Sequence, residues 1–322
     1  MVPDIVATLP MSPSHADKLG FYSLLVYAHR FATAEGMATV YAVNRVGKPD
    51  GADTVSRLCQ AVEMLDITPT IWWDDASVTE SAFAKRMGRL YADGFISTNL
   101  CEVKRCACGK VEHIDSPLFG KKKTLIKDGH ATCCDTVVTV RKDSVLVTTP
   151  LPHVMTPLTT PQWAHRELDT VLAELAGRRL LVSRETPRIF AFRDEHGRTW
   201  HVDTDLLWWL YLAWLSSSDA IPRQLVVGHS IIRQTGIVLA VSSTLGLPIP
   251  ERIHCLPKVL FQPGNGVQTL KQAVSRFGPT RVTNALAWAS MSGMKQYVLS
   301  SSLFTDMKNS VPSVFSRHKL RL

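Results

Sequence analysis

Residues 5–51 decide the fold and read IVATLPMSPSHADKLGFYSLLVYAHRFATAEGMATVYAVNRVGKPDG. IVATL is a short β-rich run, and the breaker MSPS follows it with Ser14 as a candidate helix N-cap. An apolar, aromatic-rich helix is predicted over 19–34, and Gly36 would end it before the buried strand ATVYAVN. The stretch therefore predicts a βαβ unit and, with it, a parallel sheet.

The loop after the first strand is a candidate ligand site. His15, Asp17 and Lys18 lie where this loop enters the helix. At that point unpaired backbone N–H groups and the helix dipole favour an anion. We therefore expect the chain to bind an anionic group there.

Composition limits the class of protein. The chain has 322 residues, of which 45% are hydrophobic and 20% charged, as expected for a globular protein with one large core or two modules. It lacks an apolar stretch of membrane-span length and a basic region followed by an apolar signal core, so we expect a soluble, cytoplasmic protein without a membrane partner. The net charge of +8 permits a polyanionic partner such as RNA, although a merely basic enzyme explains it equally well.

The segment 101–142 is rich in cysteine and predicts a metal site. Two tight pairs supply four thiolates, which are those of Cys106, Cys108, Cys133 and Cys134. They would satisfy a tetrahedral structural zinc in a reducing compartment, whereas a closed site of this kind leaves no open position for catalysis. Because these pairs are tighter than the usual CxxC, Cys101, His113 or His130 could replace one ligand. The alternative is a set of cysteines left over from a lost site.

Residues 52–100 predict two amphipathic helices, DTVSRLCQAVEMLDI and TESAFAKRMGRLYADGFI, on either side of the strand in TPTIWWDDAS. Trp72 and Trp73 are expected in the core. For Asp74 and Asp75 a solvated turn or a helix N-cap is favoured over contact with a substrate.

The downstream half carries a resemblance to a known family. A strand ending in Gly228-His229-Ser230, a helix through Arg233 to Leu245 and the run GLPIPERIHC follow in the order seen in class I aminoacyl-tRNA synthetases of the methionyl, isoleucyl, valyl and leucyl subgroup. His15-Ala16-Asp17-Lys18 stands at the position of the family's His-Ile-Gly-His signature and keeps its first histidine. The loop 255–264 is shorter than the family's Lys-Met-Ser-Lys-Ser loop and leaves Lys258 as its first lysine.

The resemblance implies a fold and a domain plan. It predicts a Rossmann-like, doubly wound parallel sheet in an α/β protein, with a zinc-knuckle connective insertion and a C-terminal helical stem. The first half of the catalytic domain would span 1–100, the insertion 101–150, the second half 151–262 and a stem remnant 263–322. An anticodon-binding domain is not expected after the stem.

The resemblance also implies site residues. His15, Lys18 and Lys258 would be catalytic. The run TWHVDTDLLWWLYLAWL at 199–215 resembles the family's aromatic stretch that faces either the adenosine or the amino acid. Residues implied to bind the nucleotide or the aminoacyl group are Arg45, Asp203, Trp208, Tyr211, Gly228, His229 and Ser230.

The departures from the family bear on the chemistry. The second histidine and the second lysine are replaced, and each lost donor costs about 3 kcal/mol in the barrier to amino-acid activation. Arg45 and Lys48 follow the second strand, where they would repel a free amino group and attract phosphate or carboxylate.

Three functions follow from these departures. We favour a repurposed core that moves an aminoacyl group from aminoacyl-tRNA to a small-molecule or amino-acid acceptor. A divergent ATP-dependent ligase and a non-catalytic tRNA- or nucleotide-binding paralogue are the alternatives. The implied ligands are structural zinc, ATP or aminoacyl-adenosine, and the acceptor arm of tRNA; DNA is not expected as a partner.

Overall fold

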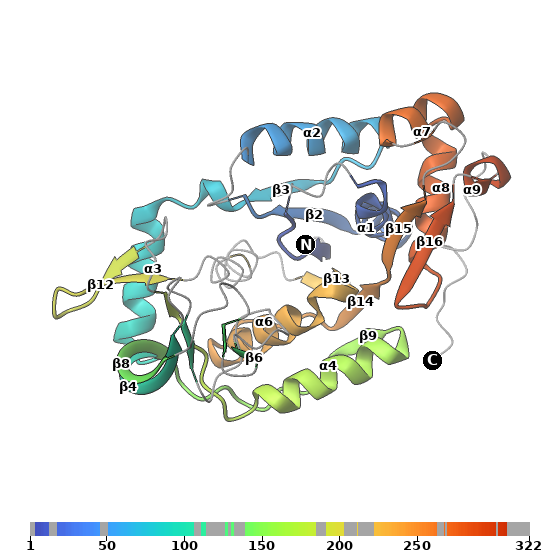
Figure 1. The fold of residues 1–322 in the computed structure, drawn as a ribbon. Helices are drawn as coiled ribbons and strands as arrows, with labels where there is room; N and C mark the ends of the chain where they lie inside the picture. The colour runs from blue at the N-terminus through green and yellow to red at the C-terminus, as the bar shows by residue number, and fades with distance from the viewer. Residues whose placement is uncertain are drawn as a thin grey trace.

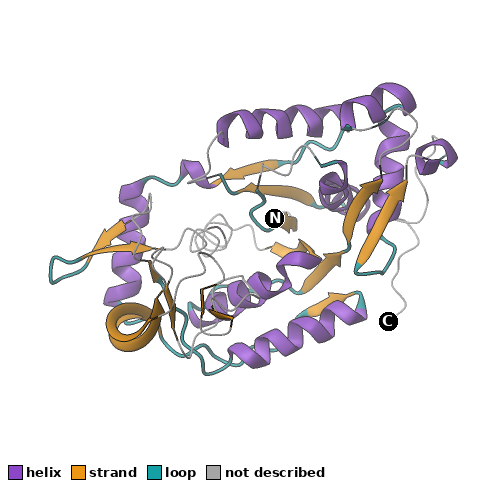
Figure 2. Cartoon of the chain, in the orientation of Figure 1, coloured by secondary structure: helices purple, strands orange, loops and turns teal. Residues whose placement is uncertain are grey.

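The structure is a computed structural model of the chain and describes residues 4–12, 18–45, 51–105, 111–113, 126–127, 130–131, 139–184, 191–202, 211, 222–262, 267, 269–300 and 302–307. Figure 1 shows a central sheet with helices above and below it, and Figure 2 distinguishes helices, strands and loops in the same view.

The central sheet has six parallel strands in the order β3-β2-β1-β13-β14-β9. Their bounds are Ile71–Asp74, Ala38–Val43, Ile5–Thr8, Pro222–Gly228, Arg252–Leu256 and Leu158–Thr160, in that order. The described residues of β1, β2, β13 and β14 are mostly apolar and buried, as expected where helices cover both faces of a parallel sheet.

Alternate residues of each strand face two different cores. Val6, Tyr41 and Val226 pack on one face with α1 Tyr22–Glu35, α2 Gly51–Met64 and α8 Pro279–Ser290. Ala7, Val40 and Leu225 pack on the other face with α3 Glu80–Ala92, α4 Gln162–Leu175 and α6 Ile232–Thr244. This period-two alternation explains the doubly wound arrangement and confirms the predicted Rossmann-like α/β sheet.

The predicted βαβ unit is present. A short 3-10 turn, η2 Leu19–Phe21, precedes α1, and Gly36 ends α1 in the left-handed conformation with φ of 66°. Glycine is favoured there because it lacks the Cβ that penalises this conformation. The strand predicted around residues 71–74 is β3, which continues into the 3-10 turn η3 Asp75–Ser77. The position of Ser14 lies outside the described residues.

A separate β region interrupts the doubly wound unit. β4 Ile96–Arg105 and β8 Thr139–Thr148 form an antiparallel ribbon, with β5 Val111–His113 beside β4. β6 Ile126–Lys127 pairs with β7 His130–Ala131. A small sheet follows from β10 Ser183–Arg184, β12 Thr199–Val202 and β11 Ala191–Arg193.

The four cysteines of the predicted zinc site lie outside the residues that the structure describes. Within the described part, no group of three or more His, Cys, Asp or Glu side chains could hold a metal. The zinc site and the domain boundaries therefore stay predictions.

After β14 the described residues form a two-stranded parallel sheet and three further helices. β15 Lys258–Gln262 follows β14 and pairs with β16 Gln296–Ser300, far along the chain. Between them α7 Leu270–Phe277 ends at Gly278, and Pro279 starts α8; α9 Ser302–Asp306 follows β16. The helical stem is thus joined by a strand pair that the sequence did not predict.

None of the helices in the described part of the chain combines the length and the hydrophobicity that a membrane span requires.

Candidate ligand-binding site at the carboxyl edge of the sheet

The order of the strands predicts a crevice for a ligand between β1 and β13. β1 and β13 are neighbours, yet the chain continues from β1 toward β2 and β3 and from β13 toward β14 on the opposite side. The loops that leave β1 and β13 therefore diverge. In open α/β sheets a ligand binds at the carboxyl ends of the strands where the order reverses in this way.

Lys18 and Lys258, the lysines predicted to be catalytic, lie at the beginnings of two segments that contact each other at this edge. Lys18 precedes η2, and its carbonyl accepts a hydrogen bond from the Phe21 N–H at 2.9 Å. Lys258 is the first residue of β15, directly after β14. A Cβ on Gly20 would lie 2.0 Å from the Val259 carbonyl oxygen, so η2 and β15 are packed backbone against backbone. Glycine is required for this contact, and both lysine side chains are exposed.

The residues predicted at the end of β13 start a 3-10 turn. Gly228 precedes η5 His229–Ile231, whose second residue, Ser230, is exposed. The His229 ring is half-buried and meets Trp163 of α4 edge-on, with centroids 5.2 Å apart.

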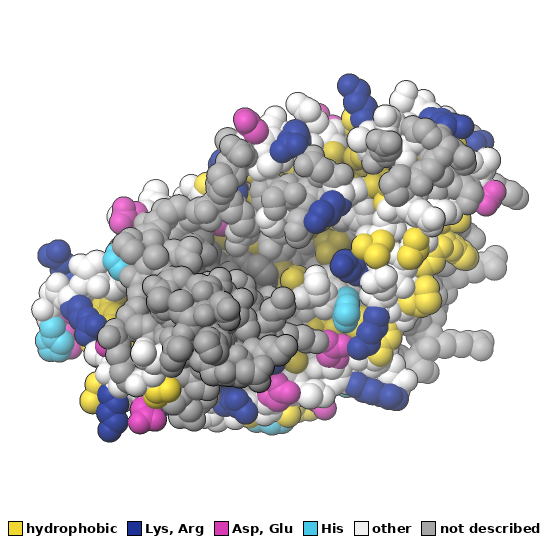
Figure 3. Space-filling model, in the orientation of Figure 1, with side chains coloured by type: hydrophobic (Ala, Val, Ile, Leu, Met, Phe, Trp, Pro, Cys, Tyr) yellow, Lys and Arg dark blue, Asp and Glu magenta, His cyan; other side chains and the backbone are white. Residues whose placement is uncertain are grey.

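A charged cluster surrounds His229, and we call Trp163, Glu167, His229 and Lys295 the Glu167 cluster. Glu167 Oε2 accepts a hydrogen bond from Lys295 Nζ at 2.9 Å and lies 3.8 Å from His229 Nε2. The Lys295 ammonium lies 5.3 Å from the centre of the Trp163 ring, within the range of a cation–π contact. Figure 3 shows lysine or arginine side chains, a histidine and an acidic side chain together over the region where Figure 1 draws β13, β14 and β15.

Cys255 lies close to this cluster at the end of β14. Burial, together with a smaller contribution from the Glu167 charge, raises the pKa of the Cys255 thiol to about 12, and the Lys295 charge opposes this rise. The thiol is therefore protonated at neutral pH and is not a nucleophile of the site.

Arg45, at the end of β2, has a partner in the structure. Its Nε donates to both carboxylate oxygens of Asp74, at 2.8 and 3.0 Å, and this hydrogen bonding raises the pKa of Arg45. Asp74 also caps η3 by accepting from the Ala76 N–H, which confirms the predicted N-cap. Asp75 is completely buried and accepts from the Arg45 N–H at 2.8 Å, so the predicted solvated turn is wrong for this residue. An anion would have to compete with Asp74 for the guanidinium.

The remaining predicted residues divide into two groups. Tyr211 is fully buried, and its ring centroid lies 4.8 Å from that of Trp73, which is itself in the core as predicted. His15, Asp203 and Trp208 lie outside the described residues. The roles assigned to all the predicted site residues stay predictions.

Sequence reasoning missed Trp163, Glu167 and Lys295. The first two are four residues apart on α4, and this spacing places them on one face of the helix. No pattern in the sequence connects Lys295 with them, because the contact depends on the pairing of β15 with β16.

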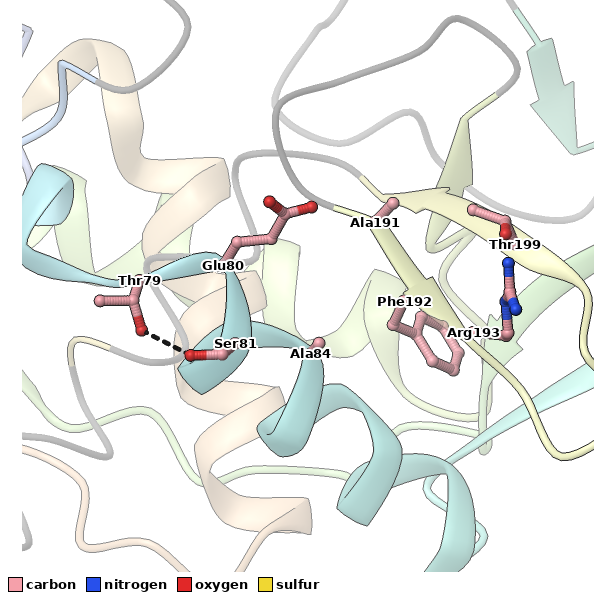
Figure 4. Close-up of a pocket in the computed structure, with 8 residues that line it drawn as sticks. All are labelled: Thr79, Glu80, Ser81, Ala84, Ala191, Phe192, Arg193 and Thr199. Carbon is pink, nitrogen blue, oxygen red and sulfur yellow. Dashed lines mark hydrogen bonds between the residues drawn. The ribbon is translucent and has the colours of Figure 1, made fainter.

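A groove of about 620 Å³ lies elsewhere, between the start of α3 and the strands β11 and β12. Figure 4 shows Glu80 and Ser81 on the helix side and Arg193 and Thr199 on the strand side, with Thr79 and Ser81 hydrogen bonded at 3.2 Å. None of the predicted site residues lines this groove. We therefore take the carboxyl edge, and not the groove, as the candidate site.

Among the comparisons with known proteins, only those with solved structures found a match. No protein-family model matches the chain, and curated proteins give no match. Solved structures of Mycobacterium tuberculosis methionyl-tRNA synthetase do match it. One, in complex with methionyl-adenylate, is 14% identical with a TM-score of 0.65 over 95% of this chain and 68% of that chain. A second, also bound by methionyl-adenylate, is 14% identical with a TM-score of 0.67 over 97% and 69%.

The apo form of that synthetase is 16% identical, with a TM-score of 0.60 over 89% of this chain and 61% of that chain. At such low identity the likeness concerns the fold alone. The chain is thus structurally similar to the catalytic core of a class I aminoacyl-tRNA synthetase.

Proposed function

We propose that the chain binds the aminoacyl-adenosine end of an aminoacyl-tRNA and transfers the aminoacyl group to a small-molecule or amino-acid acceptor. The observation that carries this proposal is the contact of Gly20 with the Val259 backbone at the carboxyl edge. Through it Lys18 and Lys258 stand on two touching segments beside the crevice between β1 and β13.

The charge of these groups supports an anionic ligand. Lys18 and Lys258 are exposed, and their ammonium groups attract phosphate. The similar fold of methionyl-tRNA synthetase, in structures that hold methionyl-adenylate, supports an aminoacylated nucleotide as the class of ligand.

The transfer itself needs little beyond positioning. The acceptor amine attacks the ester carbonyl carbon, the bond from that carbon to the ribose oxygen breaks, and the ribose oxygen takes the proton that the amine releases. Holding both reactants in one crevice lowers the barrier by removing the cost of bringing them together. His229, at the end of β13, and His15 are the candidates to carry the proton.

The loss of the paired signature residues favours transfer over activation. Activation of an amino acid by ATP develops charge on the α-phosphorus and on pyrophosphate, which the family's second histidine and second lysine stabilise. Aspartate and lysine replace Gly and His at 17 and 18, and the segment after β14 offers Lys258 alone of the two lysines. Transfer from an ester develops no such charge, so it tolerates these changes.

A divergent ATP-dependent ligase is the second candidate. It is favoured by the similarity to structures that hold methionyl-adenylate and by the lysines that remain at the carboxyl edge.

The test compares two assays on the same protein. ATP–pyrophosphate exchange is measured over all twenty amino acids, and binding of bulk aminoacyl-tRNA is measured beside it. We expect no exchange, together with aminoacyl-tRNA binding that His15→Ala and Lys258→Ala weaken about tenfold each. Lys271→Ala, an exposed lysine on α7, is the matched control and should bind as the wild type does. Pyrophosphate exchange with any amino acid would contradict the transferase and support the ligase. No signal in either assay would leave the non-catalytic paralogue.

A further inference from the structure

Glu167 lies next to two side chains of the carboxyl edge, those of Lys295 and His229. Its Oε2 accepts from Lys295 Nζ at 2.9 Å and lies 3.8 Å from His229 Nε2. Trp163, one helical turn earlier on α4, contacts both the His229 ring and the Lys295 ammonium. A carboxylate thus occupies the point on which a lysine and a histidine from two other elements converge.

Lys295 is tied to the predicted catalytic lysine. The Lys258 N–H donates to the Lys295 carbonyl at 3.0 Å, because Lys258 starts β15 and Lys295 directly precedes β16 in the same parallel pair. Lys258 pairs with Gln296 at the first position of the register, and Lys295 directly precedes Gln296, so the two lysines lie on adjacent chain segments. A displacement of one backbone would displace the other.

The cluster is accessible to a ligand. The side chain of Lys295 is 57% exposed, whereas those of Glu167 and His229 are 23% and 27% exposed. A long lysine side chain that reaches from solvent onto a half-buried carboxylate can swing to another anion without disturbing the core.

We infer that Lys295 is a phosphate-binding residue of this site. In the absence of an anionic ligand, its ammonium group is paired with Glu167. The inference rests on the proposed function only in taking the carboxyl edge as the ligand site. Lys295, which directly precedes β16, supplies a second cation on the segment that pairs with β15, whereas Lys258 is the single lysine of the segment 255–264. The ligand class is a phosphate group, carried either by a nucleotide or by the terminal residues of an RNA.

The physical reason is competition between two anions. Phosphate carries more charge than one carboxylate and accepts hydrogen bonds from several donors at once, so it can draw Lys295 away from Glu167. Glu167 opposes this ligand twice, since it retains the ammonium and repels the phosphate. Removing the Glu167 charge should therefore strengthen binding, and removing the Lys295 charge should weaken it.

The experiment measures the affinity of the full chain for inorganic pyrophosphate by calorimetry. Lys295→Gln should weaken binding about tenfold, the cost of a lost hydrogen bond to a charged group. Lys295→Arg keeps the charge and should stay within about threefold of the wild type. Glu167→Gln, which keeps the shape of the side chain, should tighten binding about threefold through the loss of repulsion. Lys271→Gln on α7 is the matched control, and thermal unfolding checks that each variant is folded.

Opposite effects of Lys295→Gln and Glu167→Gln would support the inference. Equal affinities in the wild type and Lys295→Gln would overturn it, as would a loss of affinity in Glu167→Gln as large as in Lys295→Gln, because the pair would then be only structural. A wild type that does not bind pyrophosphate would overturn it as well. Failure of the transferase proposal would not change how these affinities are interpreted, because pyrophosphate binding requires neither an aminoacyl group nor an acceptor.

Two further ligands identify the source of the phosphate. ATP and a short RNA ending in CCA are titrated against the wild type and Lys295→Gln. Dependence on Lys295 for ATP alone assigns the site to a nucleotide, and dependence for the RNA assigns it to the tRNA end. Independence of Lys295 with both ligands would contradict the inference.

Discussion

At the scale of single residues, Gly20 connects the fold with the site. It is the point where the turn before α1 meets the first residues of β15, and a methyl group there would lie 2.0 Å from the Val259 carbonyl oxygen and 2.7 Å from its carbonyl carbon. These are backbone atoms that cannot rotate away. Lys18 and Lys258 lie within two residues of this contact along the chain, so the contact fixes the spacing of the two backbone segments that carry the lysines.

We predict that Gly20→Ala lowers the free energy of unfolding by about 2 kcal/mol, because overpacking of this kind displaces backbone. It should also weaken ligand binding at the carboxyl edge. Chemical denaturation measures the first effect and titration with pyrophosphate the second. Gly88→Ala is the control, because Gly88 lies in α3 and a Cβ at this position would meet nothing within 4 Å. That change should be neutral or stabilise the helix. Equal stability of the two variants would contradict the predicted contact.

His254 has a different role, within the core. Its Nε2 lies 2.6 Å from the Gln224 amide oxygen, and its Nδ1 lies 3.0 Å from the Tyr27 hydroxyl. The amide oxygen only accepts, so Nε2 carries the proton and Nδ1 accepts from Tyr27. Burial lowers the pKa of His254 to about 3, with a smaller contribution from the Arg252 charge. The imidazole is therefore neutral in the folded protein.

This burial predicts a pH dependence of stability. The unfolded histidine titrates near 6.5, so its contribution is fully present above that pH and is lost as the pH falls from 6.5 toward 3. Stability should fall by up to about 1.4 kcal/mol per pH unit in that range through this group. Urea unfolding at pH 7 and pH 5 measures the fall, and His254→Gln should show a smaller one. An identical pH dependence in the variant would disprove the assignment.

At the scale of elements, the packing of two helices depends on one small residue. Gly236 of α6 faces α4, and a Cβ there would lie 2.5 Å from Val171 Cγ1. Since α4 carries Trp163 and Glu167, the depth at which it packs on α6 also sets the position of the Glu167 cluster.

We predict that Gly236→Ala costs about 1–3 kcal/mol of stability, because a methyl group is inserted into a filled interface. Val171→Ala should recover part of this loss in the double variant, since it removes the methyl group that would clash. Denaturation of both single variants and of the double variant gives the coupling. Additive losses would mean that the two residues do not meet.

The elements also show what a sequence can predict. The βαβ unit and the helices after Gly51 and Thr79 follow from local periodicity and from residues such as Gly36, and the structure confirms them. The strand–helix–strand order after Gln224 was implied by the family resemblance, and the structure confirms it as well. The pairing of β15 with β16 joins Lys258 to Gln296, which are far apart in the chain, and no local pattern encodes it. For the same reason the contacts of Lys295 with Glu167 and of Arg45 with Asp74 were not foreseen.

At the scale of the whole molecule, the candidate site follows from the order of the strands. The crevice expected between β1 and β13 follows from the strand order. Lys18, Lys258 and His229 belong to segments at this edge of the sheet, and the Glu167 cluster includes His229. The groove beside α3 is the competing place for a ligand, since it lies on different elements.

Hydrogen–deuterium exchange of the full chain, with and without bulk aminoacyl-tRNA, tests this most directly. We predict slower exchange in residues 18–24, 228–232 and 256–262, with residues 79–84 and 191–199 unchanged. Protection confined to residues 79–84 and 191–199, with the three edge segments unchanged, would contradict the central claim that the carboxyl edge between β1 and β13 is the ligand site.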